Sequence, residues 1–304
     1  MRSVFAALER NFGNIPDLFE PEVSRIILQS SGHIERKHLQ ALFSHEAVAV
    51  HVRGFVGNVP AANLARVLLE RDAVEATSSW QVANGRGMES SDVRAVGGIP
   101  FAVASHSAKS DPSKIDRYFN QSAEEIRWLR NACDGLSPLD KLRLELDESW
   151  PGGSSLLKER ANGRPYLPGI GRVMRGPTQW GDGFCHVDDL APLSPNEGLF
   201  SANTYLELPP VGGDLHIWPV SFKNRWDFYR HAATLSLLTT PDEAGQRALR
   251  QQLPPPIVLR PKQGDLVIIC TQRPHAVQGF PIGSRVSLQS FITHQPNGAL
   301  SIDN

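Results

Sequence analysis

Two separated segments of the chain carry side chains of the types that bind metal ions. In the first, His186 and Asp188 stand two positions apart. Successive side chains of a β-strand point to opposite faces, so we expect these two to project to the same side. A third ligand from a distant strand would complete a face of two imidazoles and one carboxylate, which leaves positions open on non-haem Fe(II) for a cosubstrate and O2. His275 is the best candidate for that ligand.

The second segment places His275 after the pattern of a buried strand. Gly264 and Asp265 signal a turn, and residues 266–270 form an apolar, β-branched run of strand length. We therefore expect the metal to bind near a strand end. Zinc is the rival metal for such ligands, but the His-x-His-x-Asp signature of hydrolases fails because Phe184 occupies its first position.

Farther along the chain, an arginine falls on the polar face of an alternating segment. Arg285, Ser287 and Gln289 lie on one face, and the apolar Val286 and Leu288 lie on the other. A buried arginine requires an anionic partner, and its planar guanidinium matches a carboxylate through two hydrogen bonds, to which the Ser287 hydroxyl adds a third. An organic diacid fits this arrangement, with one end on the metal and the far end at Arg285.

These motifs, in this order, resemble the Fe(II)- and 2-oxoglutarate-dependent oxygenases, a family that shares a double-stranded β-helix, or jelly-roll, core. The resemblance covers about residues 165–295. It rests on His186-Val187-Asp188, Asn203-Thr204-Tyr205-Leu206, Gly212-Gly213, Gly264-Asp265, His275 and Arg285-Val286-Ser287. It implies that His186, Asp188 and His275 hold Fe(II). It also implies that Arg285 and Ser287 hold the distal carboxylate of 2-oxoglutarate.

The same resemblance suggests roles for side chains on two further strands. Asn203 and Tyr205 share one face of their strand, at positions where polar side chains in this family commonly line the cosubstrate pocket. His216 and Trp218 share a side of the following strand, and we expect them to be either structural residues or substrate contacts. Three arginines are expected to be solvated or paired, with one of them a candidate to bind a substrate carboxylate: Arg172, Arg175 and Arg273.

The resemblance implies a dioxygenase that hydroxylates an unactivated C–H bond of a small molecule, with O2 as oxidant and release of succinate and CO2. The implied substrate is an amino acid, an amino-acid derivative or a natural-product intermediate. Related halogenases have a small residue in place of the carboxylate, so Asp188 favours hydroxylation. Desaturation and cyclisation use the same ligands and stay open. Two other classes also stay open: a jelly-roll module that binds metal for sensing, and a cupin-type enzyme that uses iron without 2-oxoglutarate.

Length and composition limit the remaining possibilities. The chain has 304 residues, of which 40% are hydrophobic and 21% charged, as in a soluble globular protein of one large or two ordinary domains. Its net charge of -1 argues against nucleic acid or anionic membranes as partners. Its three cysteines lack CxxC spacing, and neither a signal peptide nor an apolar run of transmembrane length is evident. We therefore expect a cytoplasmic protein, and its oligomeric state stays open.

The patterns around the motifs predict a mainly β fold with helices, in which a double-stranded β-helix is buttressed by helices mostly from the N-terminal half. We expect an N-terminal α/β region over residues 1–160 that packs on a catalytic core over residues 161–304. Residues 76–113, rich in Ser and Gly, are expected to form loop and short strand that cover the pocket. A helical insertion over about residues 221–254 is expected to be either a lid over the substrate or a decoration without catalytic consequence.

Local signals predict further elements outside the motifs. Residues 47–53 alternate and are β-branched, so they predict a strand, and Pro60 predicts the start of a helix that runs to about Arg71. Capping patterns predict helices that begin near Ser122, near Ser137 and at residues 240–243.

Overall fold

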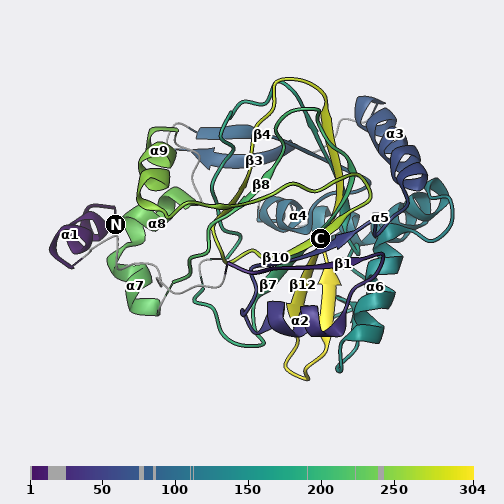
Figure 1. Cartoon of the computed structure of the whole chain (residues 1–304), viewed down its shortest axis with the longest axis horizontal. Coiled ribbons are helices and arrows are strands. Elements are labelled where there is room, and N and C mark those ends of the chain that lie inside the picture. The colour runs from purple at the N-terminus through teal and green to yellow at the C-terminus, as the bar shows by residue number, and fades with distance from the viewer. Residues whose placement is uncertain are drawn as a thin grey trace.

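Two β-sheets form the centre of the structure, a computed structural model that describes residues 2–12, 25–74, 79–84, 87–109, 111, 113–189, 191–222, 224–238 and 243–304. Within these residues the larger sheet has ten strands and the smaller sheet has three. One group of helices, α2, α3, α5 and α6, covers the larger sheet, and α1, α7, α8 and α9 gather at the other end of the molecule (Figure 1). None of the described helices combines the length and apolarity needed to cross a bilayer.

The larger sheet runs in the order β1-β2-β10-β7-β12-β6-β4-β3, and β13 joins it at β12 with β5 alongside. Its strands are β1 (Ile27–Ser31), β2 (Ala49–Arg53), β3 (Ser79–Asn84), β4 (Gly87–Val96), β5 (Ser154–Leu156), β6 (Ile170–Arg175), β7 (Leu199–Glu207), β10 (Leu266–Cys270), β12 (Ser284–His294) and β13 (Leu300–Asp303). The smaller sheet runs in the order β11 (His275–Val277), β8 (Leu215–Ile217) and β9 (Ile257–Leu259). Strands from the first third of the chain thus extend the larger sheet at both ends.

The inner faces of the two sheets pack against each other. Tyr205, Val267 and Ile269 of the larger sheet form one buried apolar cluster with Leu215 and Ile217 of the smaller sheet. Burying each such side chain contributes about 1.5–3 kcal/mol, so this cluster fixes the spacing between the sheets. Two open sheets stacked in this way are the double-stranded β-helix, as the motifs predict.

Helices cover the opposite face of the larger sheet. They are α2 (Arg36–Phe43), α3 (Asn58–Val74), α5 (Ser113–Ala132) and α6 (Pro138–Ser149), with α4 (Phe101–Ser107) beside α5. Phe200 of β7 packs under α2 and α6, and Leu206 and Val286 pack under α3. Because side chains alternate along β7 and β12, the residues between these apolar positions must face inward.

The predicted insertion is helical and packs on the outside of the smaller sheet. It contains α7 (Arg225–Arg230), α8 (Ala232–Leu235), a 3-10 helix (Ser236–Leu238) and α9 (Glu243–Gln252). Leu235 and Leu249 pack against Cys185 and Trp218 in one buried cluster. The N-terminal helix α1 (Arg2–Phe12) lies against α7 and α8, where the Glu9 carboxylate accepts a hydrogen bond from Thr234 N. Residues 240–242 of the predicted capping pattern lie outside the described residues.

Some local predictions hold and others do not. Ser137 caps α6 by accepting a hydrogen bond from Asp140 N at 3.1 Å, as predicted. Helix α5 instead begins at Ser113, and Ser122 is buried in its middle, where its hydroxyl donates to Phe119 O at 2.9 Å. Where it is described, the segment predicted as loop and short strand forms the β3–β4 hairpin and α4, because strand β4 pairs with β6.

Candidate metal and cosubstrate site

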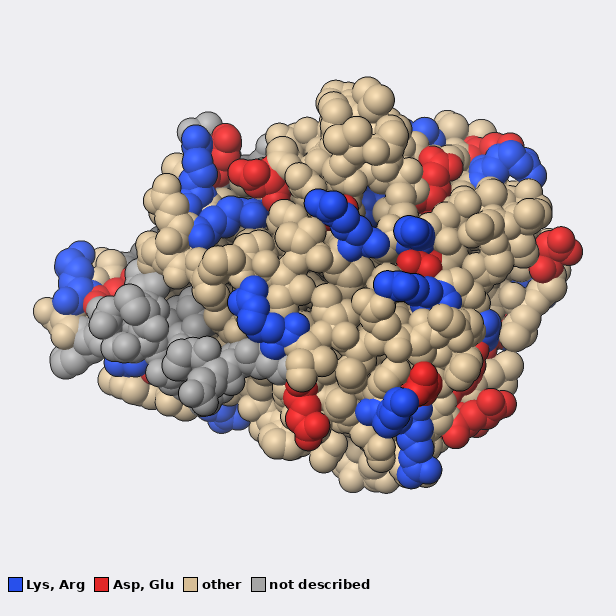
Figure 2. Space-filling view, viewed as in Figure 1, with Lys and Arg blue, Asp and Glu red and all other residues tan. Residues whose placement is uncertain are grey.

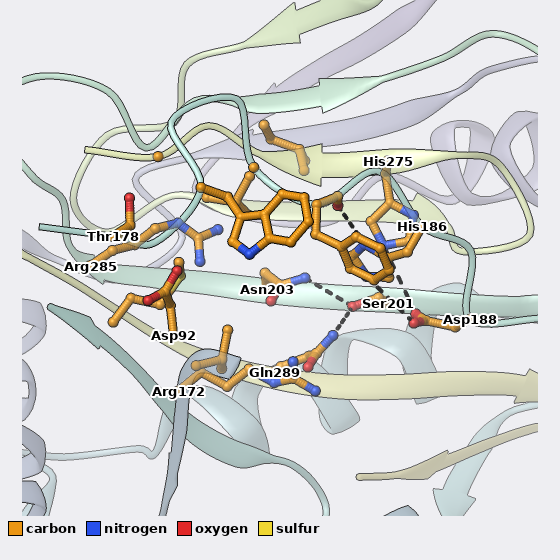
Figure 3. A pocket seen from close by; sticks show the side chains of 18 of the residues that line it. Asp92, Arg172, Thr178, His186, Asp188, Ser201, Asn203, His275, Arg285 and Gln289 are labelled. Carbon is orange, nitrogen blue, oxygen red and sulfur yellow. Dashed lines mark hydrogen bonds and ion pairs between the residues drawn. The ribbon is translucent and has the colours of Figure 1, made fainter. Parts of the chain in front are cut away.

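The three predicted metal ligands meet at the mouth between the two sheets (Figure 3). His186 and His275 exchange backbone hydrogen bonds of 3.0 and 2.9 Å, and Asp188 N donates to Thr271 O at 3.0 Å. His186 Nε2 lies 3.8 Å from Asp188 Oδ1, and His275 Nε2 lies 4.0 Å from Asp188 Oδ2. The segment around His186 forms an isolated β-bridge with His275 rather than the predicted strand, yet the side chains of His186 and Asp188 still approach each other.

A glycine allows this close approach. Gly183, three residues before His186, has a φ of +75°, a region that side-chain-bearing residues rarely adopt. A Cβ at this position would collide with the backbone carbonyl of Val277. The segment that carries His186 therefore packs directly on β11, which carries His275, because residue 183 has no side chain.

Hydrogen bonds from the backbone set the tautomers of both histidines. His186 Nδ1 lies 2.9 Å from Phe184 O, and His275 Nδ1 lies 2.9 Å from Arg273 O. A carbonyl oxygen only accepts hydrogen bonds, so each Nδ1 carries the hydrogen and each Nε2 presents its lone pair to Asp188. Burial, together with the neighbouring His186, lowers the pKa of His275 to about 4, which keeps that imidazole neutral at pH 7.

This donor set suits a divalent first-row transition metal. Two neutral imidazoles and one carboxylate each offer an atom, and these atoms all lie within 4.8 Å of one another. Ca²⁺ and Mg²⁺ prefer sets made of oxygen alone, whereas a set of two nitrogens and one oxygen with open positions is characteristic of non-haem Fe(II). The residues present therefore fit the metal that the motifs predict.

A cavity of about 370 Å³ extends from the histidines and Asp188 between the sheets. In Figure 3, Arg285 lies at the end of this cavity opposite His186, His275 and Asp188. The polar side chains that line the cavity include Arg172, Ser201, Asn203, Tyr205, Arg285 and Gln289. The apolar side chains that line it include Val93, Met174, Trp180, Phe184 and Leu238. The cavity thus joins the metal-binding residues to a cationic end.

The cationic end holds buried polar atoms that lack partners. Arg285 is 6% exposed and its guanidinium lies over the Tyr205 ring, 5.0 Å from the ring centroid. Arg285 Nε, Tyr205 Oη and Ser287 Oγ are buried and have no hydrogen-bond partner. Burial raises the pKa of Tyr205, so its hydroxyl stays protonated. Leaving such donors unsatisfied costs about 1–3 kcal/mol each, and one carboxylate would accept from all of them.

Polar side chains on the floor of the cavity form a connected group. Ser201 Oγ accepts hydrogen bonds from Asn203 Nδ2 at 2.9 Å and from Gln289 Nε2 at 2.7 Å. Its own hydrogen therefore remains available to a ligand. Asn203 lines the cavity as the motifs predict, and so does Gln289, which alternation places on the face of Arg285. Ser201 was not predicted, although the alternation of 201, 203 and 205 would indicate it.

The structure does not bring His216 and Trp218 to the cavity. On β8, Leu215 lines the cavity, so His216 faces the other side of the strand. Trp218 is buried among the helices of the insertion, with the Arg250 guanidinium 5.1 Å from its ring centroid. The two rings do lie on a common side as expected, with centroids 6.3 Å apart.

Several residues that line the cavity were not predicted, because the segments that carry them show no periodic pattern. Trp180 and Phe184 come from the loop between β6 and the metal-binding segment, and Asp92 comes from β4.

The three arginines whose roles the sequence left open occupy different environments in the structure. Arg175 forms an ion pair with Asp72 at 3.1 Å and Arg273 is fully enclosed, whereas Arg172 lines the cavity.

The fold and the cavity together define a double-stranded β-helix protein with two histidines and an aspartate beside a deep pocket. No family model matches the chain, and no curated protein matches it. Among solved structures, the chain is similar to an N-substituted L-amino acid dioxygenase from Burkholderia ambifaria AMMD, at 13% identity and a TM-score of 0.50, over 88% of this chain and 91% of that chain. This similarity confirms the predicted fold.

A second similar structure is the non-haem alpha-ketoglutarate-dependent carbocyclase SnoK from nogalamycin biosynthesis. Its identity to this chain is 12%, its TM-score is 0.46, and the similarity covers 90% of this chain and 99% of that chain.

Proposed function

We propose that this protein is an Fe(II)- and 2-oxoglutarate-dependent dioxygenase that hydroxylates an unactivated C–H bond of a small organic molecule. One observation carries the proposal: a single cavity has a set of two imidazoles and one carboxylate at one end and, at the other, a buried guanidinium whose Nε has no hydrogen-bond partner. A keto diacid matches both ends. The dioxygenase of the same fold from Burkholderia ambifaria supports this class.

The metal-binding residues prepare the site before any ligand arrives. His186 and His275 would hold Fe(II) through Nε2, with Asp188 as the third ligand. The two Nδ1 hydrogen bonds to backbone carbonyls orient both rings without loss of side-chain freedom on binding. When bound, Fe(II) supplies the redox chemistry in which O2 oxidises the substrate while 2-oxoglutarate is converted to succinate and CO2.

The cationic end would bind the cosubstrate. Arg285, Tyr205 and Ser287 would donate hydrogen bonds to the distal carboxylate of 2-oxoglutarate, which satisfies their buried polar atoms. Asn203 and Ser201 line the stretch between the carboxylate and the metal. These interactions orient the keto acid end toward His186 and Asp188.

Aromatic side chains enclose the reacting centre. The Phe184 ring stacks on His186 with centroids 5.2 Å apart and parallel planes, and Trp180 lies 6.1 Å from Phe184. Both line the cavity. Exclusion of water by these rings limits side reactions of the oxidant and favours transfer of oxygen to the bound substrate.

Small molecules are the substrates that we propose for this cavity. Its volume of about 370 Å³ lies within the range of small-ligand pockets. Lys and Arg side chains are interspersed with Asp and Glu on the face of the molecule in Figure 2. This face therefore has no basic stripe of the kind that binds nucleic acids.

An anaerobic titration of the metal-free protein with Fe(II) and 2-oxoglutarate tests the proposal. We expect a visible metal-to-ligand charge-transfer band, because the keto acid chelates the metal. In Arg285→Gln the Kd for 2-oxoglutarate should rise about 30-fold or more, since a buried charge pair is lost. Arg53→Gln, at an exposed arginine of β2, is the matched control and should leave the Kd unchanged.

The outcomes separate the alternative classes. Iron binding without the band, or turnover indifferent to 2-oxoglutarate and to Arg285→Gln, would indicate a cupin-type enzyme. The band without succinate release in the presence of any substrate would indicate a sensing module. Where succinate is released, a product that has gained one oxygen indicates hydroxylation, and a product that has lost two hydrogens indicates desaturation or cyclisation.

A further inference from the structure

We propose that Gln289 is a substrate-recognition residue, and that the substrate is a small molecule with an apolar body and an N–H or O–H group that donates a hydrogen bond to Gln289 Oε1. This inference rests on the proposed function, in which Arg285 binds the cosubstrate and oxidation takes place at the metal end of the cavity. It names a chemical group that the substrate carries.

The side-chain amide of Gln289 is enclosed in the floor of the cavity. Gln289 lines the cavity and is 8% exposed. Its Nε2 donates to Ser201 Oγ at 2.7 Å, and Asn203 Nδ2 donates to the same oxygen at 2.9 Å (Figure 3). Gln289 Oε1 therefore points away from Ser201, and within the described residues it is buried without a hydrogen-bond partner. A buried acceptor of this kind requires a donor, because an unsatisfied polar atom in the interior destabilises the protein.

Gln289 lies toward the metal end of the cavity. Arg285 and Gln289 lie on the same face of β12, four residues apart, so about 13 Å of strand separates them. Ser201, which accepts from Gln289, pairs with β10, and Asp188 N donates to Thr271 O at the end of that strand. A group bound by Gln289 is therefore close to the metal-binding residues and far from the anchored end of the cosubstrate.

Neither the cosubstrate nor the metal-binding histidines can donate to Gln289 Oε1. An amide oxygen only accepts hydrogen bonds. The cosubstrate 2-oxoglutarate is a dianion at pH 7 and carries only acceptor oxygens, and O2 has no hydrogen. His186 and His275 each use the hydrogen on Nδ1 for a backbone carbonyl. The substrate therefore supplies the missing hydrogen, which distinguishes Gln289 from the donors at the cationic end.

The surroundings of Gln289 allow it to meet such a donor. The terminal torsion of a glutamine side chain is broad, so Oε1 turns toward a ligand without leaving a favoured rotamer. Strand β12 is held on both sides by β7 and β6, so only the amide has to move. Met174, Phe184 and Leu238 line the cavity and suit a hydrocarbon body. A substrate held by one hydrogen bond at Gln289 and by apolar contacts elsewhere presents its C–H bonds near the metal.

The test uses the protein loaded anaerobically with Fe(II) and 2-oxoglutarate, in which substrates bind but cannot turn over. The probes are matched pairs in which only one member has a donor: N-isopentylacetamide with isopentyl acetate, N-phenethylacetamide with phenethyl acetate, and phenethyl alcohol with phenethyl fluoride. We expect at least one amide or alcohol to shift the charge-transfer band, and its donor-free partner to bind about tenfold or more weakly. The amide pairs test an N–H donor, and the alcohol pair tests an O–H donor.

Variants of Gln289 then assign the contact. In Gln289→Met, which removes the acceptor at similar volume, the Kd of the responsive donor should rise about tenfold, to that of its donor-free partner. The Kd values of the donor-free partner and of 2-oxoglutarate should each change less than about threefold. Gln289→Leu serves if the methionine variant fails to fold. Gln289→Glu keeps an acceptor oxygen and should retain the preference for the donor. Gln251→Met, at an exposed glutamine of α9, is the matched control.

Each other result overturns the inference. Donor-free probes that bind as well as their partners would show that water or a protein group satisfies Gln289 Oε1. Tighter binding of the donor-free members would show that Nε2 faces the ligand. A panel in which no donor binds, or a preference that survives in the methionine and leucine variants, would exclude the contact.

Two further outcomes concern the cosubstrate. Loss of 2-oxoglutarate binding in Gln289→Met would assign Gln289 to the cosubstrate instead of the substrate. Absence of the band in the unaltered protein would overturn the proposed function itself, and so is distinguished from failure of the recognition residue.

Discussion

At the scale of single residues, the site depends on how each polar atom is already satisfied. Nδ1 of each histidine donates a hydrogen bond to a backbone carbonyl, so Nε2 is the nitrogen that can bind a metal ion. The same reasoning applies to Arg285, whose Nε is buried without a partner. Atoms left unsatisfied inside a protein identify the ligand that the site requires.

Removal of the carboxylate gives the sharpest prediction at this scale. Asp188→Ala should abolish hydroxylation. It should also weaken Mn(II) binding, measured by calorimetry, by more than about 100-fold, because loss of a residue that only hydrogen-bonds to a metal ligand already costs about 10–100-fold. Asp189→Ala is the matched control, because Asp189 is exposed and its carboxylate accepts a local hydrogen bond from Ala191 N at 3.1 Å. Full activity in Asp188→Ala would contradict the ligand assignment.

At the scale of elements, helix α9 braces the metal-binding segment. Gln246 is 3% exposed, and its Oε1 accepts from Cys185 N while its Nε2 donates to Cys185 O and Leu237 O, each at 2.8 Å. Cys185 directly precedes His186. The insertion therefore positions a candidate metal ligand, in addition to placing Leu238 in the cavity wall.

Loss of this clamp should loosen the metal site. We expect Gln246→Ala to weaken Mn(II) binding about tenfold, because Cys185, beside His186, loses two buried backbone hydrogen bonds. The exposed Gln251→Ala on the same helix should leave the affinity unchanged. Equal affinities in the two variants, measured by calorimetry, would show that α9 is decoration.

A second element-scale contact ties β10 to β2. The Asp265 carboxylate accepts hydrogen bonds from His51 Nε2 at 2.7 Å, Lys262 N at 2.8 Å and Gly54 N at 2.9 Å. Burial raises the pKa of Asp265, but these hydrogen bonds outweigh it, and the folded-state pKa lies below the usual value of 3.8. The ionised form is thus the one that stabilises the fold.

The pH dependence follows from the sign of that shift. Stability from Asp265 should be present above about pH 4, the unfolded value, and should be lost as the pH falls through the lower folded value. Asp265→Asn should lower the free energy of unfolding by about 2 kcal/mol at pH 7 and flatten its acid dependence. Urea unfolding at pH 7 and pH 3 measures both effects. An unchanged slope would contradict the assignment.

At the scale of the whole molecule, the metal would join parts of the chain that meet only in the folded state. His186 and Asp188 precede the insertion and His275 follows it, so the unfolded chain offers no such site. Binding to the folded state alone adds about 2.7 kcal/mol to stability when the metal is at one hundred times its Kd. Metal and fold are therefore linked.

Thermal unfolding tests this linkage. Mn(II) should raise the Tm of the metal-free protein, and Asp188→Ala should remove the increase. Mg(II) at the same concentration should have little effect, since it prefers oxygen ligands. An equal rise with both metals would indicate unspecific binding elsewhere.

The sequence by itself was enough to predict the candidate metal-binding and cosubstrate residues and the type of fold, because spacing and alternation along single segments are short-range features. Spacing of two residues places His186 and Asp188 together, and alternation along residues 284–294 separates Arg285 from the apolar core side. The capping residue Ser137 acts through neighbours three positions away, so its helix was also predictable.

Tertiary structure alone decided the rest of the cavity. Arg172 enters it only because β6 pairs with β12, and β4 contributes Asp92 only because it pairs with β6. His216 is excluded because the apolar Leu215 takes the inner face of β8, and Ser122 lies within a helix because packing extends α5 beyond its local signal. Pairing register and packing depend on contacts between segments far apart in the chain, and no local pattern records them.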